Sequence, residues 1–321
     1  MSSDPFAFVA SVVPLNPEER GRLDRGETLV KVVPARDREV VVFSATRVTF
    51  GGDRLVAWIR RIADLKRGRY TDAIGRFSEP PRPADLAALT LEEQDLEDIR
   101  RCRPGACGVK LSDAEIETLR QRVAAAGSDW QPAVQAAFRD LVLARADAYL
   151  ALGHAAVPPY HDKGTPTSPR DEFARVIEGS GFLAEGLPDL TRHLLEYPHG
   201  PSAPIESFLY WAKERLGGRP VVSVTHVAIA RGGAPGVPQV VVAGKQVFAS
   251  HYMTGSLGLT MLLGEEDGGP GYLAYLNRSR VDLLGGLFGR LVRRIMEGRL
   301  RSEAGEAVEA LRRRIEAGDP P

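Results

Sequence analysis

This sequence of 321 residues lacks a cysteine framework, a long apolar run and an excess of charge of either sign. Its two cysteines are too few for a disulfide scaffold or a four-cysteine zinc site. No run of about 18 apolar residues occurs, so we expect no membrane-spanning helix. Basic and acidic residues number 42 each, and without a basic excess we expect no nucleic-acid partner.

Common catalytic motifs are also absent. The chain has no Gly-x-Ser-x-Gly elbow and no phosphate-binding loop with its lysine. Hydrophobic residues make up 43% and charged residues 26%, which is ordinary for a globular protein and excludes a disordered or fibrous chain. The sequence therefore names no reaction. We favour a protein that is not an enzyme, and we expect no cofactor.

The first residues, Met1 to Pro5, lack the basic patch and the apolar stretch of a secretory signal. As written, the sequence predicts a cytoplasmic protein. If Met1 replaces a signal peptide that was removed, the same chain belongs in the periplasm. The sequence leaves both compartments open.

The residue pattern divides the chain into three parts, 1–83, 84–203 and 204–321. In the first part, runs rich in valine predict strands over 28–33 and 39–49. Apolar residues at helical spacing then predict a helix from Leu55 to Ile62, and a third strand is expected over 69–77.

The middle part, 84–203, predicts a helical insertion. Ser112 and Glu115 have the spacing of a capping box at the start of one helix, and Pro132 suits the first turn of another. A proline-rich loop over 157–169 contains Tyr160 and His161, which we predict to be a lid loop over a ligand. A solvated loop is the alternative.

The last part predicts strands and then one long helix. Gly217-Gly218 is a hairpin signal between two β-favouring runs, and further strands are expected over 237–256 and 272–281. Apolar residues recur every three or four positions over 284–316, which predicts an amphipathic helix. Arginines from Arg290 to Arg301 make this helix basic, so we consider transient contact with a membrane surface. An ion-paired, solvated face is the alternative.

This order of elements resembles the helix-grip fold of the START and polyketide-cyclase-like superfamily. The resemblance depends chiefly on 206–316, where the strand Tyr272-Leu-Ala-Tyr-Leu-Asn-Arg-Ser-Arg-Val281 leads into the terminal helix. It implies an α+β protein in which a curved antiparallel sheet wraps around a long C-terminal helix. It also implies a cavity between helix and sheet, where members of the superfamily bind lipids, sterols or aromatic compounds and some act as cyclases.

At a finer level, three segments resemble a family of uncharacterised bacterial proteins. They are Cys102-Arg-Pro-Gly-Ala-Cys107, Glu206-Ser-Phe-Leu-Tyr-Trp211 and Leu276-Asn-Arg-Ser279. This resemblance implies no activity. The two cysteines are compatible with unpaired thiols, a periplasmic disulfide or a redox pair, and the sequence leaves all three open.

Candidate ligand-binding residues lie on the strands expected in the last part. Alternation places His226 on one face of its strand, and Lys245 and His251 together on one face of the next strand. If both faces point inward, two imidazoles and an ammonium enter the cavity, where they suit a polar head group or proton transfer. Tyr252 and Tyr210 are further candidates. Histidines with ordinary structural partners are the alternative, and no nearby carboxylate completes a metal site.

We therefore predict that a hydrophobic, lipid-like small molecule is bound between the sheet and the terminal helix, with 84–203 as a lid, and transport of this molecule is left open. One alternative is a cyclase or hydrolase on the same scaffold that uses the pocket histidines. Another is an interaction protein with a packed core, whose helical part binds a partner.

Overall fold

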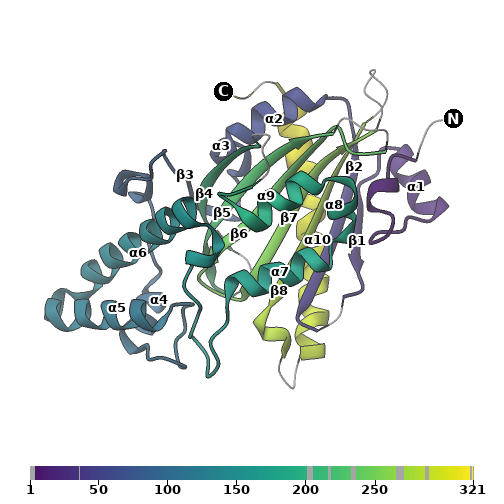
Figure 1. The fold of residues 1–321 in the computed structure, drawn as a ribbon. Helices are drawn as coiled ribbons and strands as arrows, with labels where there is room; N and C mark the ends of the chain where they lie inside the picture. Colours follow the sequence, from purple (N-terminus) through teal and green to yellow (C-terminus); the bar gives the residue numbers. More distant parts are fainter. Residues whose placement is uncertain are drawn as a thin grey trace.

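The architecture is a single curved sheet with helices on both faces (Figure 1). It is seen in a computed structural model of the chain. The structure describes these residues: 4–35, 37–200, 205–215, 218–232, 236–264, 271–285, 289–318 and 320.

Eight strands form the sheet in the order β1-β2-β8-β7-β6-β5-β4-β3, and each neighbouring pair is antiparallel. The strands are β1 (Leu29–Val33), β2 (Glu39–Val48), β3 (Thr71–Arg76), β4 (Glu206–Arg215), β5 (Pro220–Arg231), β6 (Val240–Ala249), β7 (Met253–Leu263) and β8 (Gly271–Val281).

The helices fall into three groups along the chain. Before β3 lie α1 (Pro17–Asp24), α2 (Gly52–Arg60) and α3 (Ile62–Lys66). Between β3 and β4 lie α4 (Glu93–Arg101), α5 (Asp113–Ala126), α6 (Trp130–Leu152), α7 (Pro169–Glu178), α8 (Gly181–Gly186) and α9 (Pro188–Glu196). After β8 comes α10 (Gly289–Glu316). Short 3₁₀ helices span Ala7–Val9, Pro83–Leu86, Gly127–Asp129, His154–Ala156 and Asp282–Gly285.

This order confirms the predicted fold class. Helices α2 and α3 follow β2, and β3 then forms the far edge of the sheet. The five strands β4 to β8 follow in order from that edge, so that β8 lies beside β2, and α10 is the last element of the chain. A helical insertion separates β3 from β4. The division of the chain into 1–83, 84–203 and 204–321 as separate units stays a prediction.

The two faces of the sheet have different covers, because side chains alternate between them along each strand. The inner face packs on α2, α3 and α10, with Phe208, Val227 and Val242 among its buried residues. The outer face packs on the helical insertion, where Leu259 lies in one cluster with Phe173 of α7. In Figure 1, α10 lies behind the sheet and α7 and α9 lie in front of it.

The sequence predicts the insertion to be a lid over the space between the sheet and α10. This prediction is wrong, because the insertion covers the opposite face of the sheet. The outer face is itself apolar, with Ala228, Leu257 and Met261 all buried beneath α7, α8 and α9. A sheet with two apolar faces needs a layer on each of them. The sequence pattern shows that the insertion is helical, but it does not show which face it covers.

Local predictions in the insertion agree with the structure. The Ser112 hydroxyl accepts a hydrogen bond from the Glu115 backbone amide, and the Glu115 carboxylate accepts one from the Ser112 amide at 2.7 Å. Pro132 lies in the first turn of α6. The Gly217-Gly218 turn lies partly outside the described residues, although β4 and β5 pair on both sides of it.

Most of the basic stretch Arg290 to Arg301 has side chains outside the described ones. Its described member Arg293 donates hydrogen bonds to the backbone oxygens of Glu39 and Asp37. None of the described helices has both the length and the apolar composition needed to cross a bilayer.

Candidate functional site

A polar band crosses the middle of the inner face. Its residues keep partial solvent exposure, while most of their neighbours along β5 to β8 are buried. We call them the inner-face band: Thr225, Gly244, Gly258, Thr260, Tyr275 and Asn277. A central strand in a fully packed core has no exposed positions, so solvent reaches the sheet at this place.

Strand register makes this band continuous. Asn277 pairs with Gly258, and Gly258 pairs with Gly244 on the next strand. Two residues further along β7, Thr260 pairs with Tyr275 of β8. Gly244 leaves space over the sheet, since a side chain there would meet only a Thr225 methyl group at 3.4 Å and the Gly258 oxygen at 3.8 Å. The place above Gly258 is taken by the Tyr275 hydroxyl, which a side chain would meet at 3.2 Å.

The band has an unused hydrogen-bond acceptor beside it. Gln246 follows Gly244 by two residues and is 6% exposed, and its Oε1 has no partner among the described residues. Asn277 is better satisfied, since its amide donates to Ser256 at 3.3 Å and its oxygen accepts from Ser279 at 2.7 Å. A buried acceptor without a partner costs about 1–3 kcal/mol, so a ligand donor at Gln246 would be favourable.

The charged groups near this band neutralise each other. The Lys66 ammonium of α3 lies 2.8 Å from the Glu214 carboxylate and 3.2 Å from the Tyr210 hydroxyl. Burial by itself would lower the pKa of Lys66, but Glu214 and Tyr210 outweigh it and raise that pKa. Burial raises the pKa of the Tyr275 hydroxyl, which therefore stays neutral. The inner face thus presents hydrogen-bonding groups and no free charge among these residues.

The outer face carries a separate group of aromatic and basic side chains. The Nδ1 atom of His226 on β5 is hydrogen-bonded to the Tyr149 hydroxyl of α6, at 2.7 Å. Tyr149 stacks on Tyr197, with ring centroids 5.3 Å apart, and His193 lies 5.3 Å from His226. We call this set, together with His154 and Lys245, the outer histidine cluster.

Lys245 is enclosed by this cluster and is 0% exposed. Its ammonium donates to the Leu194 carbonyl at 2.6 Å and lies over the rings of Tyr149 and Phe173. Burial, and then the positive charge of Arg170, lower the pKa of Lys245 to about 7. A neutral amine at this place is therefore accessible near physiological pH.

The three histidines of the cluster are held neutral. Burial, followed by the nearby Lys245, lowers the pKa of His226, His193 and His154. The Nε2 atom of each is buried and has no hydrogen-bond partner among the described residues. No three or more metal-binding side chains are grouped for an ion anywhere in the described part of the chain.

The residues predicted to share one pocket are separated by the structure. His226 and Lys245 lie together, but on the outer face rather than between the sheet and α10. Tyr210 lies on the inner face beside Lys66. Tyr252 lies in the turn before β7 and packs with the residues under α10.

His251 does not share a face with Lys245, because its strand ends first. The predicted run over 237–256 is broken by a turn between β6, which ends at Ala249, and β7. The pairing of β5 with β6 also shifts register between Val224 and Thr225, which alters the alternation. Instead, the Nε2 atom of His251 is 3.1 Å from a carboxylate oxygen of Asp95 on α4.

The predicted lid loop packs on the insertion. Tyr160 is 0% exposed, and its hydroxyl accepts a hydrogen bond from the Ala249 amide. His161 lies 2.6 Å through Nδ1 from Asp113. The sulfurs of Cys102 and Cys107 are bonded to each other in the structure, while the compartment and any redox role stay predictions.

Several members of both sites were missed from sequence. Tyr149, Tyr197, His154 and His193 come from helices and helix ends of the insertion, which the sequence does not place against His226. The inner-face band had a usable signal. Tyr275 and Asn277 are two residues apart on the strand predicted over 272–281, and Gly244 lies within the run predicted over 237–256. Gly258 and Thr260 lie beyond that run, on β7.

The sheet, its terminal helix and the inner-face band define an α+β protein of helix-grip architecture. No protein-family model matches the chain, and no curated protein matches its sequence. Among solved structures, it is similar to the crystal structure of the Zhui aromatase/cyclase from Streptomyces sp. R1128, at 14% sequence identity and a TM-score of 0.27. The similarity covers 47% of this chain and 92% of that one. The fold assignment rests on the strand order and helix positions of this chain.

Proposed function

We propose that this protein binds a small neutral molecule on the inner face of the sheet, against the inner-face band and beneath α10. The observation that carries the proposal is the partial exposure of that band between buried neighbours. The ligand would carry hydroxyl or carbonyl groups, because the exposed side chains there are threonine, tyrosine and asparagine.

The polarity of the band refines the ligand class expected from the sequence. A lipid-like chain is best bound by apolar walls, and the apolar inner-face residues such as Val227 and Val242 are already buried against other side chains. Thr225, Tyr275 and Gln246 offer hydroxyl and amide groups instead. A neutral molecule suits this surface, since the Lys66 ammonium is paired with Glu214.

The structure gives less support to a cyclase or hydrolase that uses histidines in this space. All six histidines of the chain lie in its described part, and none is on the inner face. His226 faces the insertion, and His251 pairs with Asp95. Binding is therefore the function that the inner face supports best.

A glycine substitution tests the proposal directly. In Gly244→Leu, the Cβ of the new side chain would lie 3.4 Å from a Thr225 methyl group, which is an ordinary van der Waals distance. The rest of the leucine side chain would extend into the space over the band. We expect native mass spectrometry of wild-type protein, purified without detergent and exposed to a small-molecule cell extract, to show a bound mass. Gly244→Leu should lose that mass.

Gly181→Leu is the matched control, because Gly181 is exposed and a side chain there meets nothing within 4 Å. It should keep the bound mass. Gln246→Leu is a second test that preserves side-chain size while removing the unpartnered oxygen, and it should weaken binding by about three- to tenfold. Wild-type protein without any bound mass, or Gly244→Leu with an unchanged one, would overturn the proposal.

A further inference from the structure

A cleft lies at the β3–β4 edge of the sheet, away from the inner-face band. Strand β3 ends at Arg76, which pairs with Tyr210, so the start of β4 pairs with β5 on one side and has no strand on the other. On that open side, the Phe77 amide donates a hydrogen bond to the Leu209 oxygen. This gap in the sheet edge leaves a cleft of about 570 Å³ between β4, α6 and the chain after β3. Its lining residues are Glu79, Pro80, Pro81, Asp147, Leu150, Ala151, Tyr197, Ser207, Phe208 and His226.

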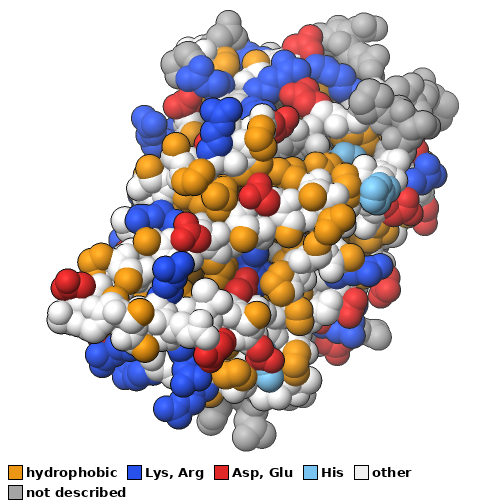
Figure 2. Space-filling view, turned by 60° about the vertical axis from the view of Figure 1, so that its left-hand side comes forward, with side chains coloured by type: hydrophobic (Ala, Val, Ile, Leu, Met, Phe, Trp, Pro, Cys, Tyr) orange, Lys and Arg blue, Asp and Glu red, His pale blue; other side chains and the backbone are white. Residues whose placement is uncertain are grey.

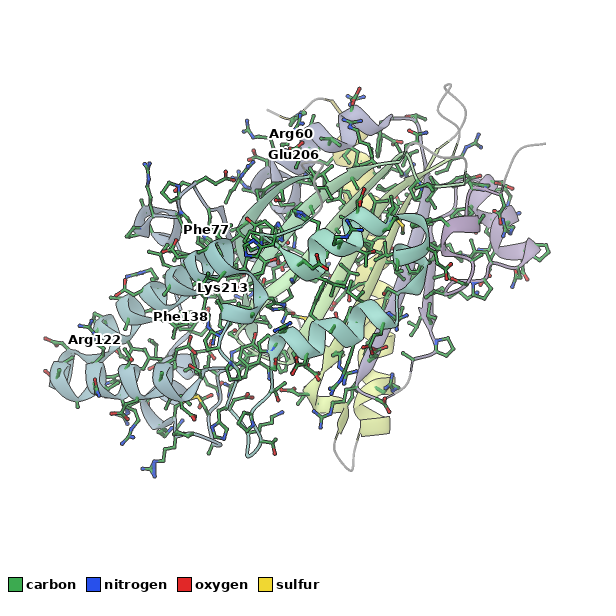
Figure 3. The ribbon with its side chains drawn as sticks, in the orientation of Figure 1. Arg60, Phe77, Arg122, Phe138, Glu206 and Lys213 are labelled. Carbon is green, nitrogen blue, oxygen red and sulfur yellow. A yellow bond between two sulfur atoms is a disulfide. The ribbon has the colours of Figure 1, made fainter. Side chains whose placement is uncertain are left out.

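The start of β4 is fixed in position on its other side. Arg60 of α2 and Glu206 of β4 lie together in Figure 3, and both of their hydrogen bonds measure 2.8 Å. Arg76 lies over the Phe208 ring, with its guanidinium carbon 4.1 Å from the ring centroid. The cleft is therefore bounded by ordered contacts and is part of the folded surface.

His226 gives this cleft one ring nitrogen, Nε2, that has no hydrogen-bond partner among the described residues. The residue is 1% exposed, and its Nδ1 is occupied by the Tyr149 hydroxyl. Its Nε2 is buried and unpartnered among the described residues, although the residue lines the cleft. A buried polar atom of this kind is costly unless a ligand or water satisfies it.

The rest of the lining is apolar with two carboxylates. Pro80, Leu150 and Phe208 supply apolar surface, while Glu79 and Asp147 are both exposed. No lysine or arginine is among the residues that line the cleft, although the Arg76 guanidinium lies over the ring of the lining residue Phe208. A cleft with apolar walls and two acidic groups favours an organic cation over a neutral molecule or an anion.

We propose that this cleft binds a small organic amine. Its ammonium would lie near Glu79 and Asp147, its apolar body against Pro80 and Leu150, and a hydrogen-bonding group at its other end would reach His226. Leu152, which follows the lining residue Ala151 along the chain, adds apolar surface and is 67% exposed. Figure 2 shows apolar side chains gathered across the middle of this side of the molecule.

This inference is independent of the proposed function, because the cleft lies at the β3–β4 edge of the sheet and shares no lining residue with the inner-face band. Gly244→Leu should abolish binding at the inner face and leave amine binding unchanged. A failure at one site therefore does not imply a failure at the other.

The test uses tyramine as the probe and two relatives as controls. Tyramine has a phenol hydroxyl at one end and an ammonium at the other, 4-ethylphenol lacks the amine, and phenethylamine lacks the hydroxyl. We expect calorimetry on the full chain to show tighter binding of tyramine than of either relative. In Glu79→Gln and Asp147→Asn, tyramine binding should weaken about threefold each, and about tenfold in the double variant. Glu185→Gln, an exposed change on α8 outside the cleft, should leave it unchanged.

Nitrogen resonances of the histidine rings give a second measurement, in which binding is followed in the wild-type protein and a variant serves only to assign the signal. In wild-type protein labelled with ¹⁵N-histidine, saturation with tyramine should shift the Nε2 signal of one buried, neutral histidine. That signal should be the one missing from His226→Gln. Equal binding of 4-ethylphenol, unchanged affinity in the double carboxylate variant, or an unmoved His226 signal would overturn the proposal.

Discussion

Replacing Lys245 by methionine should remove a strong pH dependence of folding stability. The folded protein holds the pKa of Lys245 near 7, while an unfolded chain restores it to about 10.5. Between these values the unfolded lysine carries a proton that the folded one lacks, so raising the pH opposes unfolding. The cost of burying this amine is therefore full below pH 7 and disappears as the pH approaches 10.5.

The magnitude follows from the size of the shift. One pKa unit corresponds to about 1.4 kcal/mol, so wild-type protein should gain roughly 2–3 kcal/mol over Lys245→Met between pH 7.5 and 9.5. The environment accounts for this gain, since the amine is 0% exposed and packs over the rings of Tyr149 and Phe173. The assay is urea unfolding of both proteins at several pH values, because other titrating groups cancel in the difference.

Lys66→Met is the control for this experiment. The folded protein raises the pKa of Lys66, since Glu214 and Tyr210 outweigh the effect of burial, so Lys66 is protonated in both states below pH 10. The difference between wild type and Lys66→Met should stay constant from pH 7.5 to 9.5. A constant difference for Lys245→Met as well would refute the assignment of a neutral buried amine.

Three further changes test one contact between the insertion and the sheet and two features within the insertion. Glu172→Gln should cost about 1–3 kcal/mol in urea unfolding, because the buried Arg280 loses the carboxylate 2.8 Å away and keeps only Glu39 at 3.6 Å, and an unchanged stability would contradict this. Gly153→Ala should destabilise by at least about 2 kcal/mol, since φ is +73° and the new Cβ would lie 1.9 Å from the Tyr197 oxygen; unchanged stability would show that this chain path is wrong. The disulfide at Cys102 closes a loop of only five residue steps, so reduction should cost about 2 kcal/mol, and free thiols in the unreduced, denatured protein would disprove the bond.

Much of the fold could be predicted because its signals are local. Valine-rich runs predicted β1 and β2, and the Ser112 capping box predicted the start of α5. Apolar residues that recur every three or four positions predicted α10. Together with the order of the strands, these elements were enough for the helix-grip class. Such signals act within one element, so tertiary contacts do not need to be known.

The site was less predictable because it depends on which face each residue occupies. His226 and Lys245 were correctly placed beside each other, but alternation along a strand does not say which face meets α10. His251 was misplaced because β6 ends at Ala249 and contains a register shift. The partners of His226 come from distant helices, and only the packing of the insertion on the outer face brings them together.

A crystal structure of protein purified without detergent, after exposure to the cell extract, tests the central claim most directly. The account predicts ligand density over the inner-face band, with a donor within hydrogen-bond distance of Gln246 Oε1. Side chains from α10 that fill this space and bury Thr225 and Tyr275 completely, with no density for a ligand, would contradict it.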